Sequence, residues 1–462
     1  MSTRAVKSRH TAPYRAANFE ALEGRVLMAS PGDVAIKWNE LLLQAFAIQP
    51  PRVPIFRNEA LVQVAVFDAV NAIDRSYDPY AASVHASRGA SQEAAAAQAA
   101  HDTLSALYPS RAADYDAALA QDLADIPAGR ARQGVAVGQE VARQILALRA
   151  NDHAADVVTY TPPNNNPGQY QPTPPDFTPP ANAHVPLIPP FAIQSSSQFM
   201  PGPPPALNSA EYAADYNETK AIGSINSTIR TADQTQVGLL WRLPITHFQV
   251  WNRIAQNLAA ARHTSLVDTA RAFALMDIAE NDGLETSFAT KYHYVLWRPV
   301  TAIRRGDEDG NPATAGDPTW TPLHPTTPAY PTYSGNAATN GFASSTVLDS
   351  VFGNAVPFDV HWDAYGFPGV TQSYSSFTQA AQEEADSRIY GGIHFRFDSV
   401  AGQQIGTNVG GYVLDHVLTP RDNHSSFNPN GGQGASPNQA TQDLLTGKAA
   451  ASVLGTAKAI LA

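Results

Sequence analysis

The sequence predicts an all-α protein of two helical bundles with a long proline-rich connection between them. Apolar side chains recur with helical spacing on both sides of this connection, and no strand-like alternation is sustained there. Prolines are concentrated in the connection itself. A chain of 462 residues, 44% of them hydrophobic, is long enough to bury a large core.

We expect five segments in chain order. Residues 1–34 form a basic, sorting-like segment, and residues 35–160 form the N-terminal helical domain. Residues 161–206 are the proline-rich connection, and residues 207–420 form the C-terminal helical domain. Residues 421–462 are a tail rich in Asn, Gly and Ser, a composition typical of loose structure.

The N-terminal domain contains a mostly apolar helix over Leu61–Ile73, which we expect to be buried. An alanine-rich helix follows it. Ser91 precedes that helix and is its candidate N-cap, because a serine hydroxyl accepts a hydrogen bond from the first turn. Gly129 and Gly138 are expected to interrupt the next helical segment.

Fifteen of the 36 prolines lie between Pro162 and Pro205. Each proline removes a backbone donor, so neither a helix nor a central strand tolerates this density. We expect an extended segment with polyproline character, and a disordered linker is the alternative. Large apolar side chains favour a segment that covers the protein surface: Phe177, Leu187, Ile188, Phe191 and Phe199.

Composition excludes several classes of function. The net charge of −11 disfavours a nucleic-acid partner, because phosphate backbones bind basic surfaces. Without cysteine, the chain has no disulfide, thiolate metal site or cysteine nucleophile. No apolar run approaches the roughly 20 residues of a transmembrane helix.

The first thirty residues are basic and lack the apolar segment of about 7 to 15 residues that a secretory signal contains. Residues 19–28 resemble the short Leu-Glu-x-Arg sorting segment of exported bacterial proteins, with Gly24 at the position of the usual proline. This pattern predicts export or association with the cell envelope. A disordered basic tail on a cytoplasmic protein is the alternative.

Lys291 and Arg298 are seven residues apart, two turns at about 3.6 residues per turn, so we expect both cations on one face of a helix. Pro299 should weaken or kink the helix just beyond them. Two cations on one face repel each other unless an anion lies between them or each reaches solvent. A solvated basic face is the alternative.

Two further motifs carry polar side chains next to predicted helix ends. Ser334 and Gly335 precede a helix, where a hydroxyl and backbone N–H groups can bind an anion; an ordinary serine N-cap is the alternative. Gly391 and Gly392 end another helix, so Arg388 and His394 can meet across the turn. The arginine offers a fork of donors, and the histidine a nitrogen that bonds to an electrophilic centre; a polar loop is the alternative.

The sequence contains three motifs in this order: Lys-x6-Arg-Pro, Ser-Gly and Ser-Arg-x5-His. Together they resemble the signature shared by vanadium haloperoxidases and type 2 phosphatidic-acid phosphatases. The closer resemblance is to bacterial proteins similar to vanadium chloroperoxidase, and it covers residues 35–420. It is carried by the three motifs and by residues 66–73, 251–255, 297–304 and 391–396. It implies two helical bundles with vanadate, or phosphate in the same site, bound at one end of a bundle.

The resemblance also implies the roles of single residues. His394 would ligate vanadium directly. The oxygens of the vanadate would be held by Lys291, Arg298, Ser334, Gly335 and Arg388. Several preorganised cations and donors are what a multiply charged oxyanion needs when it leaves water.

The resemblance breaks at Asn336, where the family has an acid–base histidine. An amide donates and accepts hydrogen bonds but does not exchange a proton near neutral pH. The loss of a positioned acid–base group costs roughly 10²–10⁴-fold in rate. His293 and His324 lie in or near the motifs and are candidate substitutes.

Three functions follow from these residues. The first is a vanadium-dependent peroxidase that oxidises a halide or a small organic acceptor with hydrogen peroxide. The second is an acid phosphatase with His394 as the nucleophile, and the third is a catalytically impaired oxyanion-binding protein. Phe288, one turn before Lys291, lines the halide side of the pocket or belongs to the core. The sequence is compatible with an oligomer.

Overall fold

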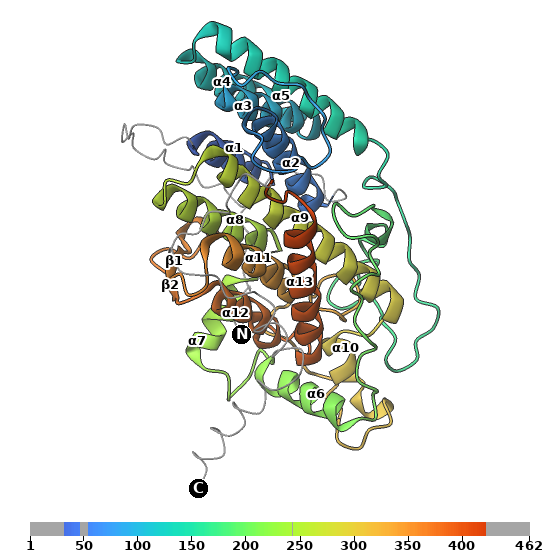
Figure 1. The fold of residues 1–462 in the computed structure, drawn as a ribbon. Helices are drawn as coiled ribbons and strands as arrows, with labels where there is room; N and C mark the ends of the chain where they lie inside the picture. The colour runs from blue at the N-terminus through green and yellow to red at the C-terminus, as the bar shows by residue number, and fades with distance from the viewer. Residues whose placement is uncertain (1–31, 47–53, 243, 422–462) are drawn as a thin grey trace, which may run out of the picture.

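The computed structural model describes residues 32–46, 54–242 and 244–421. Within them the chain is an assembly of packed α-helices, so the all-α prediction is confirmed (Figure 1). The sheet found there is one small antiparallel hairpin of β1 (Phe358–His361) and β2 (Thr371–Tyr374). The sorting-like residues 19–28 and the tail from residue 422 lie outside the described residues.

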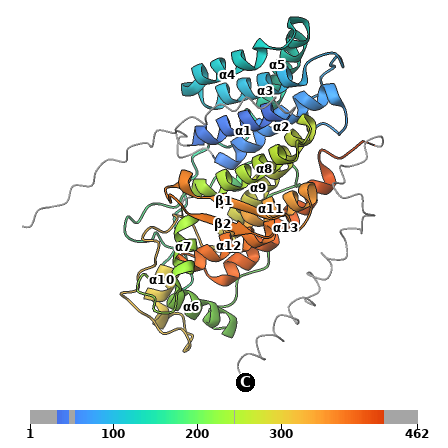
Figure 2. The ribbon, with the colours of Figure 1, turned by 90° about the vertical axis from the view of Figure 1, so that its left-hand side faces the viewer.

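The N-terminal helices occupy one end of the elongated molecule (Figures 1 and 2). They are α1 (Asp33–Ala45), α2 (Ile55–Asp74), α3 (Gln92–Leu107), α4 (Ala112–Ala124) and α5 (Ala128–Leu148), with a 3₁₀ turn η2 (Pro109–Arg111) before α4. α2 is buried along most of its length, as its apolar pattern predicts. The N-cap prediction is also confirmed, because the Ser91 hydroxyl accepts from the N–H of Ala94 at 3.1 Å.

The interruption predicted at Gly129 and Gly138 is wrong, because α5 runs unbroken from Ala128 to Leu148. A Cβ atom on Gly138 would lie 2.6 Å from the carbonyl oxygen of Ala95 on α3. The absent side chain therefore lets two helix backbones approach each other closely, and it does not end the helix. The small alanine side chains of α3 serve the same close packing.

The proline-rich segment runs along the helices in extended form, with one 3₁₀ turn, η3 (Val185–Leu187). Its backbone N–H groups at Phe191, Ala192 and Ile193 donate to the buried carboxylate of Asp282 on α9, at 2.7 to 2.9 Å. Ile188 and Phe191 are buried against the helices.

Two side chains of the same segment do not cover the surface as expected. Phe177 and Leu187 are 61% and 52% exposed. The reason is local, because Phe177 lies in a turn whose N–H donates to the carbonyl of Thr173, and its side chain faces outward. The segment is therefore anchored at a few positions and does not pack along its whole length.

The C-terminal helices form the larger part of the molecule. They are α6 (Ala210–Ile222), α7 (Ala232–Leu240), α8 (Pro244–Ala261), α9 (Leu266–Tyr294), α10 (Pro299–Arg304), α11 (Asn336–Phe352), α12 (Phe377–Tyr390) and α13 (Arg396–His416). Short 3₁₀ turns η4 (Gly306–Glu308) and η5 (Asp363–Tyr365) lie in the loops between them. No helix in the described part of the chain is both long and apolar enough to cross a membrane.

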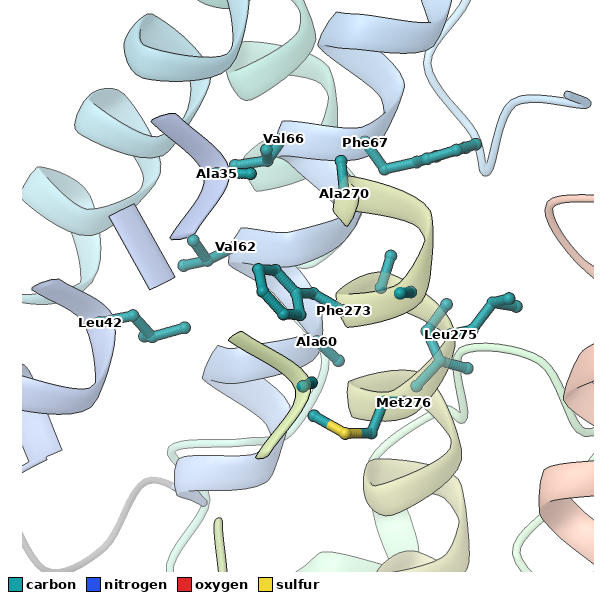
Figure 3. Close-up of a cluster of buried hydrophobic side chains, with 14 of the residues drawn as sticks. Ala35, Leu42, Ala60, Val62, Val66, Phe67, Ala270, Phe273, Leu275 and Met276 are labelled. Carbon is teal, nitrogen blue, oxygen red and sulfur yellow. The ribbon is translucent and has the colours of Figure 1, made fainter. Parts of the chain in front are cut away.

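α9 lies at the centre of the molecule and packs against α2, α11 and α13. Figure 3 shows Val62 of α2 beside Phe273 of α9, and Phe67 of α2 near Ala270 of α9. The same apolar cluster continues into α11 and α13. The N-terminal half of α9 is thus held by a core that both groups of helices share, and Lys291 lies at the other end of this helix.

Candidate oxyanion site

Lys291 lies in the last turn of α9, but Arg298 lies outside that helix. α9 ends at Tyr294, Val295 takes a left-handed φ of 53°, and Arg298 is extended directly before α10. The prediction of one shared helical face is wrong, because Pro299 forces the residue before it out of the helical region. The two cations still converge: Lys291 Nζ and Arg298 Cζ lie 5.3 and 4.9 Å from the centre of the Tyr330 ring.

The Ser-Gly motif stands at the start of α11, with Gly335 as the N-cap residue. Ser334 is fully buried, and its Oγ lies 2.9 Å from Oγ of Ser287 on α9. The N–H of Gly335 donates to the carbonyl of Asp398 at 2.8 Å. Gly335 therefore ties α11 to the start of α13, and its N–H is not open to an anion in this structure.

Asn336 begins α11 and is half-buried. Its Oδ1 accepts a hydrogen bond of 2.8 Å from Ser287, the same hydroxyl that contacts Ser334. Sequence reasoning missed Ser287. The available signal was its position four residues before Lys291, which places both side chains on one face of α9.

The third motif forms the turn between α12 and α13. Arg388 lies in the last turn of α12, Gly392 takes a positive φ of 73°, and His394 precedes α13. His394 Nε2 lies 3.0 Å from Nη1 of Arg298, so the first and third motifs meet here. The charges of Lys291 and Arg388 also lower the pKa of His394, so both cations are near enough to act on this imidazole. We call Lys291, Arg298 and Arg388 the cation cluster.

The surroundings of His394 define its tautomer. Nδ1 lies 2.9 Å from Oδ2 of Asp398 and 3.2 Å from Oγ1 of Thr332, while a guanidinium on the other side can only donate to Nε2. The proton therefore belongs on Nδ1, with a lone pair on Nε2. Burial, and then the charges of Arg298, Lys291 and Arg388, lower the pKa of His394 well below its ordinary value.

The cation cluster lies deep in the protein. Lys291 and Arg298 are fully buried and Arg388 nearly so. Lys291 donates to the carbonyls of Thr332 and Ser334, and burial, followed by the charge of Arg298, lowers its pKa well below the ordinary value. Arg298 donates to the carbonyls of Tyr330 and Ile393, but its buried Nη2 has no hydrogen-bond partner in the described residues.

A buried guanidinium nitrogen without a partner is costly, and neighbouring cations add to the cost. Asp398 is the carboxylate that acts on both Lys291 and Arg298, and burial raises the pKa of this carboxyl to about 6. Glu384 is the carboxyl group that acts on Arg388, and two carboxyl groups do not balance three cations. The donor set therefore fits a bound oxyanion, which would accept from Arg298 Nη2 and supply the missing charge.

The two histidines considered as substitutes for the acid–base group differ in position. His293 is exposed, and its ring packs edge-on against Tyr294, so it faces away from the cluster. His324 is buried beside the turn at Gly391, and its backbone N–H donates to the Gly391 carbonyl at 2.9 Å. Burial, and then the charge of Arg388, lower the pKa of His324 to about 3.

Phe288 is buried and belongs to an aromatic cluster beside the site. Its ring packs edge-on against Tyr330 at 5.2 Å and stacks on Phe56 of α2 at 6.5 Å. Phe288 is therefore a core side chain that also contacts the ring beneath two cations, and its place on the halide side of the pocket stays a prediction. Sequence reasoning also missed His247 on α8, whose Nε2 accepts from the guanidinium of Arg388.

Comparison with known proteins adds an independent line of evidence. Residues 271–423 match the family model of the VCPO second helical-bundle domain. Vanadium chloroperoxidase from Curvularia inaequalis is 26% identical over 375 residues, which span 62% of this chain and 60% of that protein. The matched part is thus less than two thirds of the relative's length.

Two solved structures resemble the whole arrangement. The first bacterial vanadium-dependent iodoperoxidase aligns with a TM-score of 0.74 and 25% identity, over 87% of this chain and 100% of its own. A bacterial vanadium-dependent chloroperoxidase in its holo form aligns with a TM-score of 0.66 and 16% identity, over 84% of this chain and 98% of its own.

Proposed function

We propose that this chain, which resembles vanadium-dependent haloperoxidases in sequence and fold, binds vanadate at the cation cluster and oxidises a halide or a small organic acceptor with hydrogen peroxide. The observation that carries the proposal is the unpartnered Nη2 of Arg298, buried beside Nε2 of His394, whose lone pair accepts from Nη1 of the same guanidinium. Vanadate bound there would supply the oxidising chemistry.

The residues of the site would hold the group as follows. Nε2 of His394 would bond to vanadium, and Asp398 would keep the Nδ1 proton in place. Lys291 and the two arginines would hold the oxygens together with Ser334. Gly335 contributes by its lack of a side chain, because a Cβ atom there would lie 3.1 Å from the Asp398 carbonyl.

Asn336 limits what the site can do with protons. Its amide, fixed by Ser287, can hold a water or peroxide molecule by hydrogen bonds but cannot pass on a proton. We therefore infer a slow peroxidase. Asn336 also favours the second candidate, an oxyanion-binding protein without turnover, because the residues that bind the anion are all present.

A single set of assays tests these functions. Purified apoprotein is supplied with vanadate, hydrogen peroxide and chloride, bromide or iodide in turn, and halogenation of an organic acceptor is measured. We expect vanadate-dependent turnover that is lost in Lys291→Ala. Vanadate binding without turnover would favour the oxyanion binder. Hydrolysis of a phosphate ester, inhibited by vanadate, would make the protein a phosphatase.

A further inference from the structure

Arg388 is held differently from the other two members of the cation cluster. Lys291 and Arg298 each donate to backbone carbonyl oxygens, which fixes them to the main chain. The guanidinium of Arg388 has one hydrogen-bond partner among the described residues, Nε2 of His247. The orientation of this guanidinium therefore depends on a single side chain.

The imidazole of His247 is fixed on two sides. Its ring stacks on Trp241 with centres 5.8 Å apart and an angle of 13° between the planes. Its Nδ1 lies 2.6 Å from Oε1 of Glu384, and only 7% of its side chain is exposed. A rotation of the ring would break both contacts, so the position of Nε2 is well defined.

Glu384 has its own support. It lies four residues before Arg388 on α12, so both side chains project from the same face of the helix. Its Oε2 accepts a hydrogen bond of 2.7 Å from the indole of Trp251 on α8. A Cβ atom on Gly341 of α11 would lie 2.6 Å from this oxygen, so the glycine leaves room for the carboxylate.

The direction of the hydrogen bond between Arg388 and His247 follows from the chemistry of the two groups, whereas His247 Nδ1 and Glu384 Oε1 lie close together but form no hydrogen bond. A guanidinium only donates, so Nε2 of His247 is an acceptor and the imidazole proton is on Nδ1, facing Glu384. Burial, and then the charge of Arg388, lower the pKa of His247 well below its ordinary value, which favours this neutral form. A carboxylate behind an imidazole fixes the tautomer and orientation of the ring.

We propose that His247, supported by Glu384, is a positioning residue of the oxyanion site that fixes the plane of the Arg388 guanidinium and leaves its other N–H groups for the anion. The inference rests on the proposed function in one respect, that Arg388 binds an oxyanion. Sequence reasoning passed over His247 because it lies 44 residues before Lys291 and outside every motif.

Calorimetric titration of the full-length apoprotein with inorganic phosphate and with vanadate tests this role. We expect His247→Leu to weaken the affinity for both anions by about 10- to 100-fold. His247→Gln should retain most of the affinity, because its amide oxygen can accept from Arg388. The exposed His293 provides the matched control, His293→Gln, which should change neither affinity.

A double-mutant cycle separates positioning from a general structural effect. If His247 acts through Arg388, then His247→Leu has no further effect on affinity in an Arg388→Ala background. Equal losses in both backgrounds, or no rescue by glutamine, would overturn the proposal. Thermal unfolding monitors the fold, and His247→Asn, whose shorter amide does not reach Arg388, replaces the leucine variant if that variant unfolds.

The same experiment distinguishes two kinds of failure. If Arg388→Ala leaves phosphate and vanadate affinity unchanged, the oxyanion site itself is wrongly placed and the proposed function fails with it. If Arg388→Ala abolishes binding while His247→Leu does not weaken it, the site stands and only the role of His247 is wrong.

Discussion

Among single residues, Asn336 has the most direct effect on the proposed chemistry. It stands at the start of α11, and its amide oxygen accepts from Ser287. The residues around it supply charge and hydrogen bonds, but the nearby histidines are either exposed, as His293 is, or held neutral by burial and cations, as His324 and His394 are. Proton transfer is therefore the part of the mechanism that this site lacks.

Replacement of this residue tests that reading. We expect Asn336→His to raise peroxidase turnover and to change vanadate affinity only modestly, because affinity depends on the cations and turnover on a titratable group. A new pH dependence should appear, starting from an ordinary histidine pKa of about 6.5 and shifted downward by the neighbouring cations. Steady-state rates across pH measure both effects.

Two results would contradict this expectation. High turnover in the unmodified protein would mean that another group already transfers the proton. Vanadate-loaded Asn336→His without a gain in turnover would mean that the pocket differs from the haloperoxidases in more than this position.

Asp398 is the second residue with a separable role, because its carboxylate fixes the Nδ1–H tautomer of His394. We expect Asp398→Asn to lower vanadate affinity by about 10- to 100-fold, as the loss of a second-layer partner of a metal ligand does. Titration with vanadate measures the loss. Asp415→Asn, on the exposed side of α13, serves as the control and should bind normally.

The sequence named the cations and His394 but not the groups that hold them. The spacing of residues within a motif was sufficient to predict the site residues that lie inside that motif. Ser287, Thr332 and His247 come from other elements, and only packing brings them to the site. The partner of His394, Asp398, was within reach of sequence reasoning, since it lies four residues further on.

At the level of elements, the positions of most helices follow from apolar periodicity. The wrong predictions concern proline and glycine, because each of these residues can have more than one structural role. α9 ends at Tyr294 and Pro299 is the first residue of the next helix, α10, whereas a kink just beyond Arg298 was expected. Gly138 was read as a break in a helix, but it is a point of close approach between α5 and α3. Such contacts depend on a partner helix, and one sequence does not contain that information.

The two glycines of α5 form a matched pair for a stability test. Gly138→Ala should destabilise the protein by on the order of 1–3 kcal/mol, because the new Cβ pushes α5 away from the backbone of α3. Gly129 has open space around it, so Gly129→Ala should stabilise by about 0.5–1 kcal/mol through better helix propensity. Urea denaturation of both variants measures the changes, and equal effects would contradict this account.

At the level of the whole molecule, the helix core contains an unusual number of buried carboxyl groups. Burial is the main cause that raises the pKa of each, to about 8 for Asp277 and well above the ordinary value for three others. The three others are Glu59, Glu280 and Glu285. Glu59 lies on α2 and the rest lie on α9, so their protonation concerns the packing of these two helices.

These groups predict how stability changes with pH. A carboxyl group with a raised pKa holds its proton more tightly in the folded state. Its contribution to the free energy of unfolding is therefore complete below the unfolded-state pKa near 4, and it is lost as the pH rises through the folded-state pKa. We expect the free energy of unfolding to fall between about pH 7.5 and 8.5, well above the ordinary histidine pKa of about 6.5, because there the unfolded histidines are largely neutral and no longer oppose the effect of the carboxyl groups. Denaturant titrations at several pH values measure it.

A variant with one such group removed provides the control. Asp277→Asn should make the decline with pH shallower, by up to about 1.4 kcal/mol per pH unit where the group titrates. Stability that rises between the same two pH values, in the unmodified protein, would show that these carboxyl groups are ionised in the core.

The three backbone N–H groups that donate to Asp282 have a consequence for the exchange of amide protons with deuterated solvent. These amides belong to no helix, yet their acceptor is a buried side chain in the middle of α9. They can exchange only when that carboxylate and the segment separate. Phe191, Ala192 and Ile193 should therefore exchange as slowly as the helix core, which would make part of a proline-rich loop a member of the most stable cooperative unit of the protein.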